Sequence, residues 1–413
     1  MTRRYMAAGH TGGAQAVVDA PSVSTTWESQ ELDTVRVERE IERLWVEMTA
    51  QRDLQRPQRI AADGDVGLMR ASTLNLVVTV EKHDDADEVE RIISQLSELT
   101  PSRAIILVRT PVKDDEPSLM IRLSVHQHEA SKLRPGIQFE CLTVGVKGEP
   151  STSLASVASS LLVPELPTFL WWCGTSLPMT ALFMELSEIS DRLLIDSATI
   201  DRRGRTLIEL SNLIHRSKIG PKASDFAWTR LLPWRQAVAQ FFESVSAQQS
   251  LETIDEVVIG YERNRSERVS GLASALLIAG WIATRLEWQA PGELVRTHDG
   301  WRVTLRAGRA GRRREVILRL RPEDEALDAC LAKLSMAAVS PHAGMYFIER
   351  VGPHTLMTRS ETTDAPVVSR AIYLHAQDIA TLLEHELRHF GRDLVFEESL
   401  QFAASLVPEG ELD

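Results

Sequence analysis

The string His385-Glu386-Leu387-Arg388-His389 is the sharpest candidate for chemistry in this chain. Two imidazoles four residues apart share one face of a helix, where they can bind zinc while the glutamate polarises a water molecule. The string therefore predicts a zinc-dependent hydrolase as one interpretation of the chain. A zinc site needs a third ligand, however, and the residues downstream offer only carboxylates such as Glu397 and Glu398. The favoured interpretation is a charged helix face beside a buried stripe formed by Leu382, Leu383, Leu387 and Phe390.

Other catalytic patterns do not occur in the sequence. No glycine-rich phosphate-binding string follows an expected strand, and there is no Gly-x-Ser-x-Gly elbow. Cys173 follows an expected strand without a histidine nearby in sequence, so a buried thiol is the simpler interpretation. A basic run separated by Gly308 and Gly311 is typical of a solvated hairpin tip, with docking of a phosphate or acidic partner as the alternative: Arg309, Arg312, Arg313 and Arg314. We expect no catalytic residues, no bound metal and no cofactor.

Tryptophan and arginine stand out instead, because they dominate the energetics of protein interfaces. Trp171 and Trp172 are adjacent at the end of an expected strand, so their side chains point to opposite faces and cannot both enter one core. One of them must face another layer or a partner. Trp228 and Trp234 flank Pro233, although Trp234 also begins the apolar stripe of an amphipathic helix, and core packing is the alternative for it.

The segment around Pro233 is expected to bend. Ser224 or Asp225 can cap a short helix, and Pro233 starts a fresh one. At such a break two arginines can point into a cleft where Asp196 or a partner carboxylate supplies the counter-charge; the alternative is an Arg–Asp bridge that ties the bend to the sheet. We predict a partner-binding site formed by Trp171, Trp172, Asp196, Asp225, Trp228, Arg230, Trp234 and Arg235.

The elements that position these residues divide into two kinds. Residues 1–29 lack periodicity and are expected to form a flexible tail. Residues 30–245 alternate apolar runs with helical patterns; the runs 74–80 and 104–108, with a helical pattern between them, indicate two parallel strands joined by a crossover helix. This predicts an α/β domain with a mixed, mostly parallel sheet. Residues 246–413 carry one apolar helix, several hairpin-like strands and two terminal helices, which predicts an α+β domain with an antiparallel sheet.

Composition narrows the class of protein. The 413 residues include 46 Lys and Arg against 58 Asp and Glu, a net charge of −12 that argues against nucleic acid as a partner. The apolar stretch Leu272–Leu286 is shorter than a bilayer needs and contains Arg285, so we expect a buried helix and no membrane partner. Three widely spaced cysteines and the lack of an apolar run after Arg3 and Arg4 indicate a cytoplasmic protein.

Several strings in this order resemble the glucose-6-phosphate dehydrogenase assembly proteins, called OpcA, of cyanobacteria and actinobacteria. The resemblance runs from about residue 30 to the C-terminus. It is carried by Arg70–Leu76, Pro101–Ala104, Leu161–Pro167 leading into Phe169–Trp172, Asp191–Ser197, Asp225–Leu231 with Pro233–Arg235, and Gly280-Trp281 before Arg285–Trp288.

The resemblance implies a non-enzymatic helper that binds glucose-6-phosphate dehydrogenase and promotes its active oligomer. Such a helper supports NADPH production by the oxidative pentose phosphate pathway. Relatives usually carry other residues at the positions of His385 and His389, which weakens the zinc hypothesis. Thioredoxin control, associated with cyanobacterial relatives, is not carried over, because this chain has no closely spaced cysteine pair near its C-terminus.

Overall fold

The computed structural model of this chain describes most of its residues. The described segments are 23–29, 34–55, 69–70, 72–96, 100–110, 118–127, 137–147, 152–174, 177, 180–200, 203–216, 222–262, 271–308, 314–323, 331–363, 365–375 and 377–408. Outside them lie residues 1–22 of the expected tail, Cys330, and three arginines of the expected hairpin tip, Arg309, Arg312 and Arg313.

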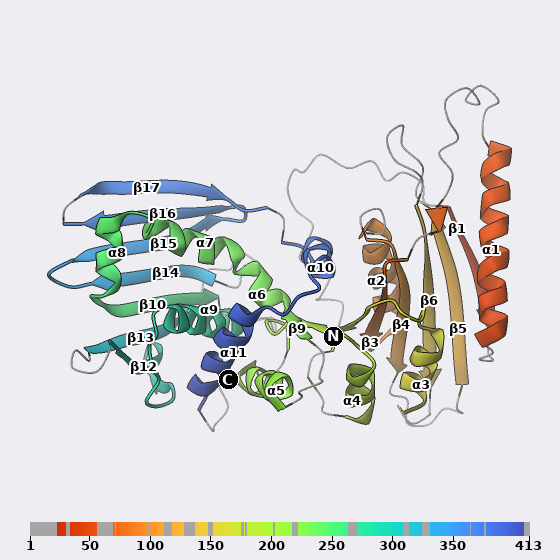
Figure 1. Ribbon diagram of the computed structural model, residues 1–413, viewed down its shortest axis with the longest axis horizontal. Helices are drawn as coiled ribbons and strands as arrows, with labels where there is room; N and C mark the ends of the chain where they lie inside the picture. Colours follow the sequence, from red (N-terminus) through yellow and green to blue (C-terminus); the bar gives the residue numbers. More distant parts are fainter. Residues whose placement is uncertain are drawn as a thin grey trace. The chain divides into compact units, whose positions relative to one another are not determined.

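The chain forms two compact parts, each with its own multi-stranded sheet and helices (Figure 1). The first part is built from residues up to 174, residues 178–194 and residues 378–390. Residues 175–177, 195–377 and 391 onward build the second part. Two sheets with helices in a two-part α/β arrangement agree with the prediction from sequence.

The sheet of the first part is mixed. Its strands follow the order β1-β5-β6-β4-β3-β7-β8-β9, with β2 beside β6; β9 is the short strand Lys222–Asp225. Pairs among β6, β4, β3, β7 and β8 are parallel, as is β2 with β6, whereas β5 pairs antiparallel with both β1 and β6. The strand bounds are β1 Val23–Ser29, β2 Met69–Arg70, β3 Leu74–Val80, β4 Ser102–Thr110, β5 Ser118–Gln127, β6 Ile137–Lys147, β7 Thr168–Trp172 and β8 Arg192–Ile195.

Both faces of the parallel strands are buried. Every residue of β3 and of β7 is buried, which explains why these strands are continuous apolar runs. Strands β3 and β4 pair in parallel across α2, the crossover that the sequence predicts. The helices of this part are α1 Thr34–Gln55, α2 His83–Leu96, α3 Thr152–Leu161, α4 Ala181–Glu188 and α10 Ile379–Leu387, the last of which packs against α2.

The first strand begins earlier than the sequence indicates. Residues 23–29, assigned to the flexible tail, form β1 and pair with β5, with Trp27 opposite Leu123. The segment Val23–Ser29 combines β-branched residues and a tryptophan, which favour a strand, but it is too short and polar to show a periodic pattern by itself.

The second sheet is largely antiparallel. Its order is β11-β12-β13-β10-β14-β15-β16-β17, and only the pair β10–β13 is parallel among the described pairs. The bounds are β10 Ile254–Glu262, β11 Val295–Thr297, β12 Gly300–Ala307, β13 Arg314–Glu323, β14 Leu331–Ala338, β15 Gly344–Gly352, β16 Thr355–Thr362 and β17 Ala365–Tyr373.

The helices of the second part are α5 Arg203–Arg216, α6 Phe226–Arg230, α7 Leu232–Phe241, α8 Val245–Leu251, α9 Leu272–Arg285 and α11 Leu394–Leu406. Helix α7 packs on β15, and α9 packs on β10 and β13. Helix α9 is buried along most of its length, as the sequence predicts, and packs closely on α11. A Cβ atom added at Gly280 would lie 2.2 Å from the Ser399 carbonyl oxygen, so glycine allows the two helices to approach. No helix in the described segments is long and apolar enough to cross a bilayer.

The division by contacts differs from the boundary that the sequence places near residue 245. Residues 195–245 belong with the second part, because α5 packs against α11 and because the rings of Phe241 and Phe242 contact Tyr346 of β15. Independent folding of residues 30–245 is a separate property, and that boundary stays a prediction.

Candidate partner-binding site

The bend at Pro233 is built around Asp225. This residue ends β9 and caps α6, its side chain accepting a hydrogen bond from the Ala227 amide at 2.9 Å. Its Oδ1 also accepts one from the Ser197 amide at 3.0 Å. Helix α6 ends after a single turn and α7 begins at Leu232, with Pro233 in its first turn. Of the two caps that the sequence allowed, the structure uses Asp225.

An ion pair ties the end of α6 to the turn after β8. The Arg230 guanidinium donates to both carboxylate oxygens of Asp196, at 2.8 and 2.7 Å. Asp196 is buried, and 16% of the Arg230 side chain is exposed. The backbone carbonyl of Arg230 accepts a hydrogen bond from the Gln377 side chain at 3.1 Å. The predicted Arg–Asp bridge therefore exists, and it links segments within the second part.

A second carboxyl lies beside that pair. Burial and the nearby charge of Asp196 raise the pKa of Asp225 to about 7, against an ordinary value near 3.8. Its Oδ2 is buried and has no hydrogen-bond partner among the described residues. The cluster of Asp196, Asp225 and Arg230 therefore holds two carboxyls and one cation, and Asp225 changes its charge close to neutral pH.

Trp228 anchors the other side of the bend. Its indole donates to Asp393 Oδ2 at 2.9 Å, and the Arg235 guanidinium lies 3.5 Å from the ring centroid in a cation–π contact. Asp393 also caps α11 through the Phe396 amide. Sequence reasoning missed Asp393, although an aspartate directly before an apolar helical pattern is a cap signal that could have pointed to it.

The remaining predicted tryptophans are core residues in this chain. Trp234 is buried on α7, and Trp171 and Trp172 are buried on opposite faces of β7 in the first part. Trp172 meets Phe183 of α4 edge to face, and the Arg109 guanidinium lies 4.7 Å from its ring centroid. The sequence left open whether one of these adjacent tryptophans faces another layer of the chain or a partner. In the structure, layers of the same chain cover both faces of β7.

The predicted site residues thus make internal contacts, and only two of the eight keep part of their side chains accessible, Arg230 and Arg235. The structure brings Asp196, Asp225, Trp228, Arg230, Trp234 and Arg235 together in the second part. Trp171 and Trp172 belong to the first. Whether these residues bind a partner stays a prediction.

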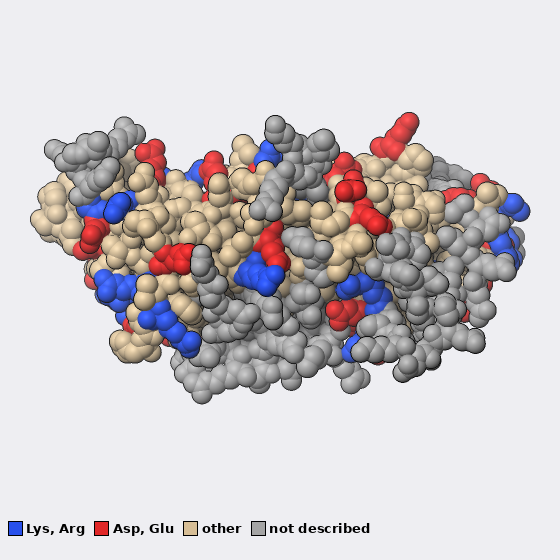
Figure 2. All heavy atoms as spheres, turned by 90° about the horizontal axis from the view of Figure 1, so that it is seen from below, with Lys and Arg blue, Asp and Glu red and all other residues tan. Residues whose placement is uncertain are grey.

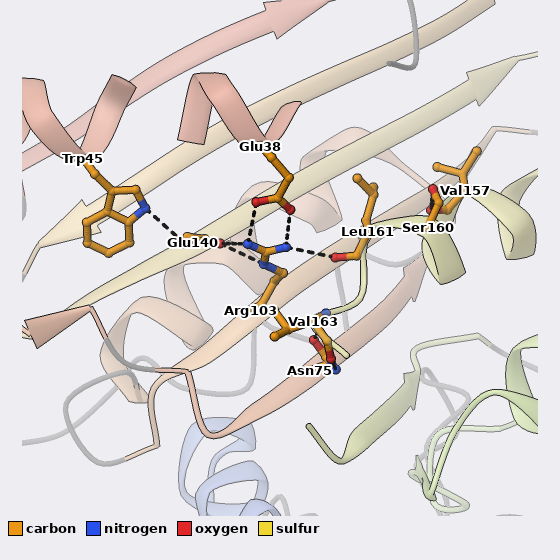
Figure 3. A network of polar contacts seen from close by, with 9 residues as sticks. All are labelled: Glu38, Trp45, Asn75, Arg103, Glu140, Val157, Ser160, Leu161 and Val163. Carbon is orange, nitrogen blue, oxygen red and sulfur yellow. Dashed lines mark hydrogen bonds and ion pairs between the residues drawn. The ribbon is translucent and has the colours of Figure 1, made fainter. Parts of the chain in front are cut away.

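A second charged cluster lies in the first part (Figure 3). Arg103 of β4 donates to Glu140 of β6 at 2.8 Å, to Glu38 of α1 at 2.6 Å and to the Leu161 carbonyl at 3.3 Å. Trp45 donates to the other oxygen of Glu140 at 3.1 Å. Burial alone would lower the pKa of Arg103, but the hydrogen bond to Glu38 and the charge of Glu140 raise it above its ordinary value.

Asn75 fixes the chain next to this cluster. Its side chain accepts from the Val163 amide at 2.9 Å and donates to the Val163 carbonyl at 3.0 Å (Figure 3). The strings around Asn75, Arg103 and Leu161–Pro167 carry the family resemblance, and here they meet in space. A charge in each of two apolar strands, at Arg103 and Glu140, is the sequence signal for such a buried pair.

The zinc hypothesis finds little support in the geometry of α10. The two imidazole rings lie with centroids 4.5 Å apart and tilted by 31°, but Nδ1 of His389 contacts the His385 carbonyl at 2.6 Å. Glu386, which would have to polarise a water molecule, is buried. Among the described residues no group of three or more His, Cys, Asp or Glu side chains is placed to hold a metal ion.

Comparison with known proteins identifies the family of this chain. Residues 93–212 match a family domain described as the N-terminal domain of the glucose-6-phosphate dehydrogenase subunit. Residues 221–400 match the one described as the C-terminal domain of that subunit. The two matches follow each other in order and cover most of the chain. It belongs to the OpcA family of glucose-6-phosphate dehydrogenase assembly proteins.

Relatives named OxPP cycle protein OpcA support this family. The protein of Nostoc punctiforme is 26% identical over 76% of this chain and 67% of its own length. That of Synechocystis is 26% identical over 52% of this chain and 44% of its own. The transcriptional regulator Gal80p of Kluyveromyces lactis, at 12% identity, covers 80% of this chain and 87% of that one with a TM-score of 0.46, which says nothing about function.

Proposed function

We propose that this chain is a non-catalytic assembly protein for its cognate glucose-6-phosphate dehydrogenase. It binds the dehydrogenase, promotes the active oligomer and so supports NADPH supply by the oxidative pentose phosphate pathway. The observation that carries the proposal is that both halves of the chain match, in order, domains described as parts of a glucose-6-phosphate dehydrogenase subunit.

The proposed compartment is the cytoplasm. Cys141 and Cys173 are buried thiols, which suits a reducing environment. On the face drawn in Figure 2, Lys and Arg side chains are interspersed with Asp and Glu. The surface described there has no extended region of positive charge of the kind that attracts nucleic acid.

We place the contact with the dehydrogenase at the bend between α6 and α7. Arg230 and Arg235 keep accessible side-chain surface there, and Leu232 between them is an exposed large hydrophobic residue. Arginines around an apolar side chain are a common composition for an interface. In this proposal Asp196, Asp225, Trp228 and Trp234 hold the bend in shape from inside, and Trp171 and Trp172 support the first part.

The test pairs two variants at equivalent helix positions. Leu232 begins α7 and Val245 begins α8, and both are exposed, so Leu232→Glu and Val245→Glu each add a negative charge at a helix start, where the dipole favours it. The dehydrogenase rate is measured without the chain, with the wild type and with each variant. We expect activation by the wild type and by Val245→Glu, and roughly tenfold weaker activation by Leu232→Glu.

Two outcomes separate the parts of the proposal. No activation by the wild type contradicts the assembly function itself. Activation by the wild type with equal activity of both variants contradicts only the placement of the contact at the bend.

A further inference from the structure

The second sheet has two unlike faces. On one, α9 packs on β10 and β13 and α7 on β15 (Figure 1), and the rings of Phe241 and Phe242 contact Tyr346. Because side chains alternate along a strand, the residues between these buried ones point to the other face. We call that other side the open sheet face.

The strand register defines the rows of the open sheet face. One row runs Val258, Ser335, Phe347, Arg359 and Ser369, each opposite the next across neighbouring strands. The flanking rows run through Glu256, Ala337 and Met345 on one side, and through Lys333, Glu349, Met357 and Ala371 on the other.

The composition of these rows is unusual for a solvated face. An antiparallel sheet with one wet face shows polar residues at every second position. Here many outward positions carry apolar side chains beside the charged ones: Val258, Ile317, Ala337, Met345, Phe347, Met357, Val367, Ala371 and Tyr373. Met345 is 37% exposed, Val367 55% and Tyr373 69%. Most of these apolar side chains lie on β14 to β17, interspersed with charged and polar ones, and apolar surface gathered in this way marks an interaction site.

Several charges on the open sheet face are paired with one another, and the further charges that the register places there, Arg302, Arg306, Glu315 and Glu349, balance in sign. Arg319 meets Glu256 at 2.8 Å, Lys333 meets Glu323 at 2.6 Å, and Arg359 meets Glu361 at 2.5 Å. The face is therefore close to neutral, in a chain whose net charge is −12. A strongly charged partner would find no spare counter-charge among these pairs, whereas an identical neutral face would fit.

We propose that the open sheet face is the interface between two copies of this chain, packed face to face about a twofold axis. A twofold interface uses the same surface on both copies, so a neutral, apolar face is self-complementary. Elsewhere two chains of charge −12 repel each other, and this face is where they can approach.

The size of the face suits a stable dimer. Eight strands about 4.8 Å apart, with about nine residues rising about 3.3 Å each, span roughly 35 by 30 Å, or about 1000 Å². A standard interface buries about 800 Å² on each partner. The inference concerns self-association and does not depend on the proposed function.

The test uses two neighbouring valines of β17. Val367 lies on the open sheet face, while Val368 lies on the opposite side of the same strand and is 41% exposed. Val367→Glu and Val368→Glu make the same chemical change in the same strand, so they share any effect on strand stability. Met345→Glu adds a position nearer the centre of the face. Sedimentation equilibrium measures the dissociation constant of the dimer for each, without dehydrogenase.

We expect the wild type and Val368→Glu to form dimers of the 46.1 kDa chain. Val367→Glu together with Met345→Glu should raise the dissociation constant roughly 100-fold, because a buried like charge enters from each copy. If the double variant does not fold, Val367→Glu alone, at a half-exposed position, carries the comparison. A monomeric wild type, or equal dissociation constants for the Val367 and Val368 variants, overturns the proposal.

Discussion

Each of the two parts of this protein holds a cluster of one arginine and two carboxyl groups, and the two clusters differ in which group has a shifted pKa. In the first part Arg103 contacts both Glu38 and Glu140 directly, and the pKa of the arginine is raised. In the second part Arg230 pairs with Asp196, while Asp225 accepts from backbone amides and has a pKa of about 7. In the first cluster the arginine therefore contacts both carboxyl groups, whereas in the second one carboxyl lies outside the ion pair and has a pKa near neutrality.

The largest loss of stability is expected for a substitution of Arg103 in the first part. Arg103→Gln leaves Glu140 buried without its counter-charge, which should lower the free energy of unfolding by about 4 kcal/mol. Urea unfolding measures it. The control is Arg205→Gln, which removes an exposed pair with Glu209 one helical turn away and should cost about 0.4 kcal/mol. Equal losses for the two variants would contradict a buried, energetically coupled cluster.

A smaller loss of stability is expected for a substitution of Arg230 in the second part. Arg230→Gln removes the guanidinium that pairs with buried Asp196, but more of Arg230 than of Arg103 reaches solvent, 16% against 5%. We expect a loss of about 2 to 3 kcal/mol at neutral pH, measured in the same urea titration. A loss larger than that of Arg103→Gln would mean that the Arg230 cluster contributes more to stability than the Arg103 cluster.

The pH dependence separates the clusters more sharply. A carboxyl whose pKa is raised on folding stabilises the protein while it is protonated, and this stability is lost as pH rises from its unfolded value to its folded one. For Asp225 the window runs from about pH 4 to about pH 7. Asp225→Asn keeps an oxygen for the Ala227 and Ser197 amides and cannot ionise. Relative to the wild type, it should gain about 2 kcal/mol between about pH 5 and about pH 8.

The matching change in the first part is the control for that experiment. Glu140→Gln, which removes the carboxylate that pairs with Arg103, should be destabilising at both ends of the same pH range. If the difference in stability between Asp225→Asn and the wild type does not change with pH, Asp225 is ionised throughout this range.

The smallest effect is expected at the indole of Trp228. Arg235→Lys keeps the positive charge above the ring but loses the planar guanidinium, so it should cost about 0.5 to 1 kcal/mol. Thermal unfolding resolves such a change. Arg235→Gln, which removes the charge as well, should cost more; the reverse order would rule out a cation–π contribution.

Much of the first part could be predicted from local patterns. The crossover of β3, α2 and β4 follows from two apolar runs around a helical stripe, and in the second part the cap and bend at Asp225 and Pro233 follow from their stereochemistry. The Arg230–Asp196 bridge was one of two alternatives, since sequence gives no distance between residues so far apart. Strand β1 was missed because its stability comes from pairing with β5 and not from its own pattern.

The burial of the predicted site residues could not be predicted from the sequence. Trp171 and Trp172 face opposite ways as expected, but both faces of a mostly parallel sheet are covered, so neither needs a partner for burial. The contribution of Asp393 to the Trp228 contact spans 165 residues, and only the folded chain brings the two together. Residue type marked the cluster, whereas exposure, which decides what a partner can touch, depended on tertiary packing.

The assembly function is tested most directly by the mass of the cognate dehydrogenase in sedimentation velocity, alone and with increasing amounts of this chain. The dehydrogenase should shift to a larger, more active species that contains this chain, with Leu232→Glu shifting it less than Val245→Glu. An unchanged sedimentation coefficient and an unchanged rate at every ratio would contradict the account.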